Sequence, residues 1–230
     1  MSTTPALLAI SHGTASRDGQ EAVGALVNAV AQRLPDVTVR LGHVDVQQPD
    51  VAASLAAIPS SQPVVIVPLL LSAGYHVHVD LVEQTAHDPR VTIAPALGPD
   101  GKLVEILWMR LAPFNPSPQD ALVLAVAGSS DERANEDCRQ AARMLAERCE
   151  REVAVGFLAA VQPGLDEVVS RARAESDRVL VASYLLAPGF FQDRARKSAV
   201  GCAVSSPLLE PGAAPDALVE LVLERYSSAL

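Results

Sequence analysis

Three side chains that can bind a metal ion or move a proton lie at the ends of short apolar segments in the first half of the chain. His12 follows the segment 6–11, Asp45 lies near the end of 37–46, and His76 follows 64–71. Neutral imidazoles and a carboxylate suit a divalent first-row metal ion, and imidazole also accepts a proton near neutral pH. If the three segments are parallel strands, their carboxyl ends meet at one sheet edge. The spacing therefore predicts a metal or proton-transfer site at that edge.

The second half of the chain repeats the first but lacks these three side chains. Residues 8–14 correspond to 124–130, 65–76 to 180–191, and 103–105 to 218–220. The repeat is too long for a solenoid and indicates a duplicated domain. The exchanged pairs are His12 and Ala127, His76 and Phe191, and, counted back from Pro49 and Pro163, Asp45 and Ala159.

Apolar runs of strand length alternate with longer segments of helical periodicity, which predicts parallel sheets covered by helices on both faces. We therefore expect an α/β fold with two similar doubly wound domains, at 1–113 and 121–230, joined by a Pro-rich linker at 114–120. In the first half, strands are expected at 6–11, 37–46, 64–71 and 91–94, and helices at 19–34, 49–58, 78–87 and 102–111.

The composition narrows the choice of partner and compartment. The 230 residues carry a net charge of -9, which argues against nucleic acid as the main partner, because phosphate binding needs a basic face. Three cysteines, at 138, 149 and 202, form no CxxC pair and are expected as free thiols in a reducing compartment. Neither a signal peptide nor a membrane span is evident, so a cytoplasmic location is expected.

The other histidines leave alternatives open. His43 has the same strand parity as Asp45, and a core position or a ligand position fits it equally. His78 faces the same way as His76 only if that segment is extended. His87 precedes Asp88-Pro89 and is expected to be solvated at a helix end.

The second half carries its own distinctive loop. Phe190 and Phe191 precede a run with three cations, and the small turn residues Gly128 and Ser129 are kept. This run suits a solvated basic helix, or a wall for a flat ligand that carries carboxylates, with Arg194 binding an acid group. The residues expected to contact the substrate are Gly13, Thr14, Gly74, Tyr75, Gly128, Ser129 and Arg194.

The motifs together resemble the class II tetrapyrrole chelatases, in particular the long form of the sirohydrochlorin chelatases. They are Ser11-His12-Gly13-Thr14, a carboxylate four residues before Pro49, and the segment from Pro68 to Gly74-Tyr75-His76. The resemblance covers essentially the whole chain and implies that His12 and His76 handle the metal. Asp45 stands where the family usually has Glu, and Thr14 where it usually has Ser.

The resemblance implies insertion of Fe²⁺ or Co²⁺ into sirohydrochlorin, in siroheme or cobalamin biosynthesis. The metal, for which Ni²⁺ is also chemically suitable, is then a substrate, and no permanent cofactor is expected. A monomer without nucleic-acid or membrane partners is expected, because the two halves can pair within one chain. A carrier of metal or tetrapyrrole without turnover is the alternative. A flavodoxin-like phosphate binder is weaker, because no GxGxxG or Lys-Ser/Thr phosphate motif is present.

Overall fold

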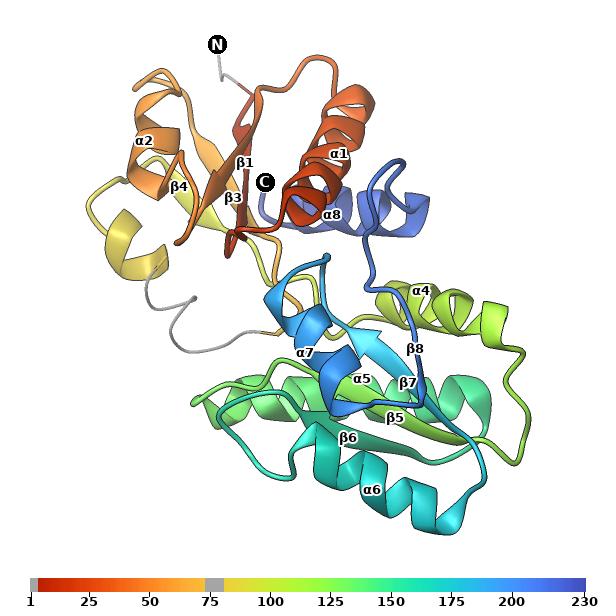
Figure 1. Ribbon diagram of the computed structural model, residues 1–230. Helices are drawn as coiled ribbons and strands as arrows, with labels where there is room; N and C mark the ends of the chain where they lie inside the picture. The colour runs from red at the N-terminus through yellow and green to blue at the C-terminus, as the bar shows by residue number, and fades with distance from the viewer. Residues whose placement is uncertain (1–3, 73–80) are drawn as a thin grey trace.

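Two four-stranded parallel sheets form the framework of this computed structural model, which describes residues 4–72 and 81–230 (Figure 1). The strand orders are β2-β1-β3-β4 and β6-β5-β7-β8, so both repeats have the same topology. The first repeat contains β1 (Ala6–Ser11), α1 (Arg17–Arg33), β2 (Val39–His43), α2 (Val51–Ala56), β3 (Val64–Pro68), a helical segment at 81–85, β4 (Val91–Ile93) and α4 (Gly101–Leu111). The second contains β5 (Ala121–Val126), α5 (Glu132–Cys149), β6 (Val153–Phe157), α6 (Leu165–Glu175), β7 (Val179–Tyr184), α7 (Phe190–Ser198), β8 (Ala203–Val204) and α8 (Asp216–Ser228).

The strands are apolar on both sides because helices cover both faces of each sheet. All residues of β1 and β3 are buried, and alternate residues of β1 enter two different cores. Leu7 and Ala9 pack toward α1, whereas Leu8 and Ile10 pack toward α2. The predicted α/β class with two similar domains is confirmed. The predicted strands 37–46 and 64–71 are longer than the observed β2 and β3.

The last helix of each repeat packs on the sheet of the other repeat. Helix α4 ends the first repeat but lies against α5 and β7, and α8 ends the second repeat but lies against α1 and β3 (Figure 1). The loop that begins with the 3-10 helix Ala112–Phe114 joins the repeats. We use "first lobe" for the sheet β1–β4 with its helices and α8, and "second lobe" for the sheet β5–β8 with its helices and α4.

Two equivalent arginines hold this exchange in place. Arg225 on α8 donates to the carbonyls of Ala96 (2.9 Å) and Leu97 (3.0 Å) and to Asp100 (3.0 Å), in the segment that leads into α4. Arg110 on α4 bonds Glu210 and the Leu208 carbonyl (3.1 Å), in the segment that leads into α8. One cluster of buried apolar side chains, which we call the inner core, extends from one lobe to the other. The exchange therefore joins the lobes by packing as well as by the chain.

Candidate functional site between the two lobes

A cleft of about 640 Å³ lies where the carboxyl ends of the two sheets face each other. This volume is typical of small-molecule sites, and the carboxyl ends of parallel strands are where such folds bind ligands. None of the described residues that line it is Lys, Arg, Asp or Glu. Its lining comprises Ser11–Ala15, Val23, Val46, Leu69–Ser72, Ala127–Ser129, Ala134, Asn135, Cys138 and Tyr184–Phe191.

The loop after β1 places His12 at the first-lobe wall of the cleft. The side chain of His12 is exposed and follows the buried Ser11 directly. Gly13 has φ +96°, a conformation that L side chains rarely adopt, and a Cβ there would lie 2.2 Å from the Asp45 carbonyl oxygen. Glycine therefore allows the His12 and Asp45 loops to touch.

Backbone and side-chain hydrogen bonds join these two loops. The Asp45 N–H donates to the His12 carbonyl (3.1 Å), and the Thr14 N–H donates to Oε1 of Gln47 (2.8 Å). Thr14 also lines the cleft, and its Oγ1 accepts the Ser16 N–H (3.1 Å). Gln47 was not predicted as a site residue. Its only sequence signal is its place two residues before Pro49, in the loop that carries Asp45.

The carboxylate of Asp45 is exposed and bonded locally. Its Oδ1 accepts the N–H of Val46 (2.7 Å), a residue with φ +62°. Val46, but not Asp45, is among the cleft-lining residues. The structure thus brings the His12 and Asp45 loops together, and the bond to Val46 uses only one of the two carboxylate oxygens. Residues 4–72 and 81–230 contain no group of three His, Cys, Asp or Glu able to hold a metal ion. His76, Gly74, Tyr75 and His78 lie outside the described residues.

The second lobe has the same loop geometry but has alanine in place of the histidine and the aspartate. The Ala159 N–H donates to the Ala127 carbonyl (2.9 Å), just as Asp45 donates to His12. Gly128 has φ +85°, and a Cβ there would lie 2.1 Å from the Ala159 carbonyl oxygen. The hydrogen bonds therefore pair Ala127 with His12 and Ala159 with Asp45, as the sequence repeat predicts.

His43 is a core residue in this structure. It is 4% exposed, and its Nδ1 lies 2.8 Å from the hydroxyl oxygen of Ser11, which is also buried. Burial lowers the pKa of His43, which favours the neutral ring. Phe157 takes its place in the second lobe, stacked under the guanidinium of Arg139. The exposed His87 agrees with the expectation of a solvated helix end.

The second-lobe wall is apolar and aromatic. Phe190 and Phe191 line the cleft, and their rings meet edge to face with centroids 5.4 Å apart. Phe190 is 70% exposed, which is unusual for such a large apolar side chain. Arg194 is exposed and lies outside the cleft lining, one helical turn beyond Phe190 on α7. An acid group of a ligand would meet Arg194 only at the rim.

The described turn residues predicted to contact the substrate lie in the cleft lining. One further lining residue, Cys138, was not predicted. Gly128 and Ser129 line the cleft, as do Gly13 and Thr14 on the opposite wall. Cys138 also lines it, and burial raises the pKa of its thiol to about 12. Near neutral pH this thiol is therefore uncharged and adds to the apolar lining of the cleft.

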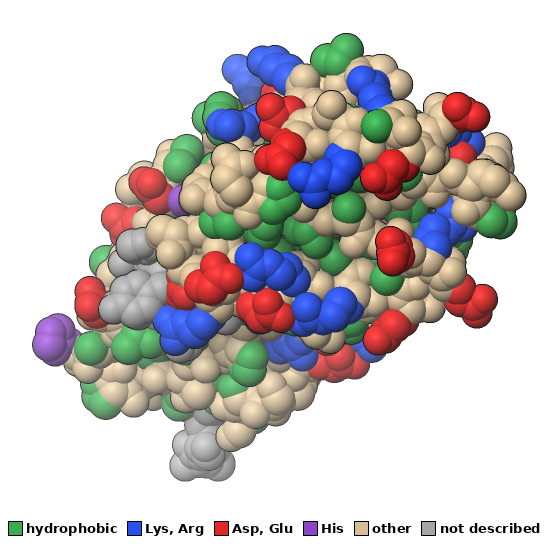
Figure 2. Space-filling view, turned by 90° about the horizontal axis from the view of Figure 1, so that it is seen from below, with side chains coloured by type: hydrophobic (Ala, Val, Ile, Leu, Met, Phe, Trp, Pro, Cys, Tyr) green, Lys and Arg blue, Asp and Glu red, His purple; other side chains and the backbone are tan. Residues whose placement is uncertain are grey.

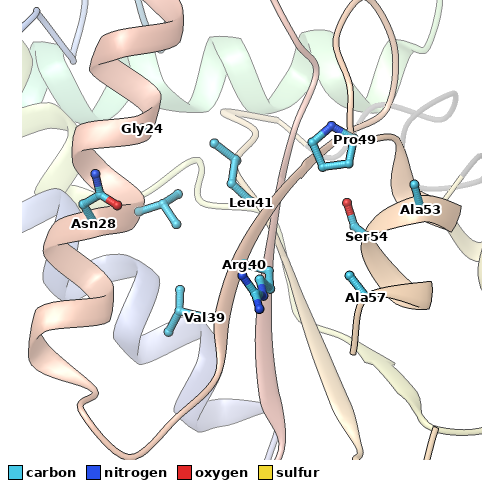
Figure 3. A pocket seen from close by; sticks show the side chains of 10 residues that line it. Gly24, Asn28, Val39, Arg40, Leu41, Pro49, Ala53, Ser54 and Ala57 are labelled. Atoms are coloured by element: carbon cyan, nitrogen blue, oxygen red, sulfur yellow. The ribbon is translucent and has the colours of Figure 1, made fainter. Parts of the chain in front are cut away.

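A second hollow of about 400 Å³ lies away from the cleft, beside the edge strand β2. Figure 3 shows it between α1 and α2, with Gly24 and Asn28 on one side and Ser54 and Ala57 on the other. Among the described residues, the buried Ser54 hydroxyl has no hydrogen-bond partner. His12 lines the cleft and does not line this hollow, so the cleft is the candidate site.

Side chains of both charge signs are mixed on the surface of the described residues. Acidic and basic side chains are interspersed on the face shown in Figure 2. Ion pairs such as Arg139–Glu132 (2.6 Å) and Arg171–Glu167 (2.8 Å) join opposite charges. Within the described ranges, no helix is both long and apolar enough to cross a membrane.

Two similar α/β lobes face each other across a cleft, with His12 in the lining of one wall and Asp45 in the loop beside it, which is the architecture of a two-domain α/β protein with a ligand-sized cleft between its repeats. The CbiX family model matches residues 6–113 and 121–211. The chain therefore belongs to the CbiX family, a family of class II sirohydrochlorin chelatases.

Two curated relatives are similar to this chain in sequence, and a solved structure is similar to it in fold. A sirohydrochlorin cobaltochelatase of Sulfolobus acidocaldarius is 29% identical over 106 residues, 85% of its length and 44% of this chain. One from Methanococcoides burtonii is 29% identical over 91 residues, 70% of its length and 39% of this chain. Each therefore matches about one repeat. SirB from Bacillus subtilis with Fe³⁺ has a similar fold, with TM-score 0.79 and 22% identity over 98% of this chain and 95% of that chain.

Proposed function

We propose that this protein inserts Fe²⁺ or Co²⁺ into sirohydrochlorin, as a step of siroheme or cobalamin biosynthesis. The single observation that carries the proposal is the asymmetry of the cleft. The two walls share one backbone geometry, but only the first has an imidazole in the described cleft lining, with the Asp45 carboxylate in the loop bonded to it. The names of the relatives support the substrate.

The geometry suits a division of work between the walls. The apolar wall formed by Leu185, Leu186 and Phe190 can pack against the faces of a flat ring. Ring carboxylates then extend toward the rim, since the described lining contains no Lys or Arg. Arg194, one turn beyond Phe190 on α7, and Arg17, the first residue of α1, are candidates to bind them.

The reaction requires that two protons leave the inner ring nitrogens as the divalent metal enters. His12 is exposed at the wall, and its neutral imidazole can accept the two protons in turn and release each of them to water. We infer that Asp45, in the loop bonded to that of His12, holds the incoming cation through its second carboxylate oxygen, since the Val46 N–H uses only Oδ1. A role for His76 as the second imidazole rests on the sequence alone. Metal and tetrapyrrole are both substrates, and no resident cofactor enters the scheme.

The test is a continuous absorbance assay of metal insertion under anaerobic conditions. Purified protein is mixed with excess sirohydrochlorin and with Fe²⁺, Co²⁺ or Ni²⁺ in turn. Many turnovers per protein with at least one metal support the proposal, and the ratio of kcat/KM values identifies the preferred metal. A spectral change that stops at one equivalent per protein identifies a carrier and overturns the proposal.

A further inference from the structure

A buried tyrosine joins the two lobes across the cleft. Tyr184, the last residue of β7, donates its phenol to the carbonyl of Leu71, which follows β3 (2.9 Å). Tyr184 is 2% exposed, yet both residues belong to the cleft lining. The bond therefore spans from one wall of the site to the other.

The space around this bond is filled closely by residues of the first lobe. A Cβ at Gly98 would lie 2.3 Å from the Leu71 carbonyl oxygen and 2.3 Å from the Tyr184 hydroxyl. The Leu97 N–H next to it donates to the Leu70 carbonyl (2.9 Å), and Arg225 holds the Leu97 carbonyl. The segment that carries the Leu71 carbonyl is therefore held by its own hydrogen bonds. For this reason the bond from Tyr184 can keep the two walls at one separation.

The duplication does not explain this contact. Leu69 stands at the position of Tyr184 in the first repeat, because Val64 and Val179 occupy the same register against their central strands. Burial raises the pKa of Tyr184 well above its usual value, so the phenol remains a donor at working pH. The proposed roles of His12 in accepting protons and of Asp45 in holding the metal do not involve Tyr184.

We propose that Tyr184 is a positioning residue whose bond to the Leu71 carbonyl sets the width of the cleft and thereby how tightly the tetrapyrrole is held. This inference rests on the proposed function for the identity of the ligand only. The Tyr184 ring packs in the inner core, so replacement by Phe removes the hydroxyl and keeps the ring.

The chain offers a matched control. Tyr226 on α8 is 3% exposed and donates its phenol to the Pro5 carbonyl (2.6 Å), before β1 and hence at the amino end of the first sheet. Tyr184→Phe and Tyr226→Phe each remove one buried phenol–carbonyl bond between segments distant in sequence. Only the first of these bonds lies in the cleft.

In steady-state insertion assays, Tyr184→Phe is expected to raise the KM for sirohydrochlorin by up to about five- to tenfold, the most that one lost hydrogen bond can transmit to ligand binding, with a much smaller change in kcat. Tyr226→Phe is expected to leave KM unchanged, although both variants lower the melting temperature. An equal KM in wild type and Tyr184→Phe, or an equal rise in both variants, overturns the inference.

A distance measurement tests the same point without turnover. Spin labels on cysteines introduced at the exposed Ser60 and Glu175, one in each lobe, report the separation of the lobes in a background free of the three native cysteines. We expect a shifted or broader distance distribution in Tyr184→Phe and the wild-type distribution in Tyr226→Phe. A wild-type distribution in both variants overturns the inference. Wild-type protein that is inactive with sirohydrochlorin overturns the proposed function, while this measurement still decides the role of Tyr184.

Discussion

The loops that end β1 and β5 share one backbone and differ in chemistry. Both have a glycine at positive φ pressed against a carbonyl from the next loop, and both are tied by the same backbone hydrogen bond. One loop presents His12 to the cleft and the other presents Ala127. The fold therefore maintains the loop geometry, and the imidazole of His12 and the carboxylate of Asp45 are a separate property of the first lobe.

The largest expected effect on activity follows from replacing His12 with alanine, the residue that the second lobe has at this position. His12→Ala removes the proton acceptor and should lower kcat for metal insertion by at least about 100-fold, the usual scale of general-base catalysis. Binding of the metal-free tetrapyrrole, followed by fluorescence quenching, should change little, because the apolar wall is intact.

The reciprocal change sharpens the comparison. Ala127→His in the His12→Ala background should restore no activity, because Ala159 supplies no carboxylate beside it. His87→Ala, at an exposed position outside the cleft lining, is the control and should retain wild-type rates. Full activity of His12→Ala would contradict the assignment of this wall.

The two glycines provide the next largest effect. Gly13→Ala and Gly128→Ala each place a Cβ about 2 Å from a backbone oxygen at a positive φ, so each should lower the free energy of unfolding by about 2–4 kcal/mol. Urea titration measures this loss. If the loop geometry serves stability in both lobes but positions catalytic side chains only in the first, the two variants lose similar free energies of unfolding. In that case kcat of the folded protein falls much more for Gly13→Ala than for Gly128→Ala. Equal losses of kcat would mean that both walls act in the reaction.

Local patterns in the sequence were sufficient to predict the lobes and part of the cleft. Apolar runs such as 64–68 mark strands covered on both faces, and the positions of Pro49 and Pro163 are enough to align Asp45 with Ala159. The hydrogen bonds of Asp45 and Ala159 confirm that alignment. These features were predictable because residues close together in the chain determine them.

Contacts between segments far apart in the chain were not predictable in the same way. The periodicity of α4 shows that it has one apolar face but not which sheet that face covers, so the helix exchange was missed. Tyr184 and Gln47 have ordinary surroundings in the sequence, and their roles depend on carbonyl and amide groups brought near by the fold. His43 was ambiguous because strand parity does not show how deeply a residue is buried.

A smaller effect is expected from the buried pair Ser11–His43, which the second lobe replaces with Val126 and Phe157. Burial lowers the pKa of His43 from 6.5, so the unfolded chain binds its proton more readily than the folded chain. The stability that this group confers is therefore present above about pH 6.5 and is lost as pH falls, by at most about 1.4 kcal/mol per pH unit. The double variant Ser11→Val/His43→Phe should show a shallower fall in urea stability from pH 7 to pH 5. Parallel curves for the variant and wild type would contradict this.

The smallest effect is expected at the cleft rim, where Arg194 is exposed and outside the lining. A carboxylate bound there remains in contact with water, so Arg194→Ala should raise the KM for sirohydrochlorin only about two- to threefold at low salt. Screening should remove the difference near 0.5 M salt, where the Debye length falls to roughly 4 Å. Arg196, on the same helix, lies 3.9 Å from Asp193, so Arg196→Ala is the control for loss of one positive charge. A rise in KM of the same size in both variants would indicate a general effect of net charge on an anionic substrate, whereas a rise in Arg194→Ala alone would place one of the ring's acid groups beside Phe190.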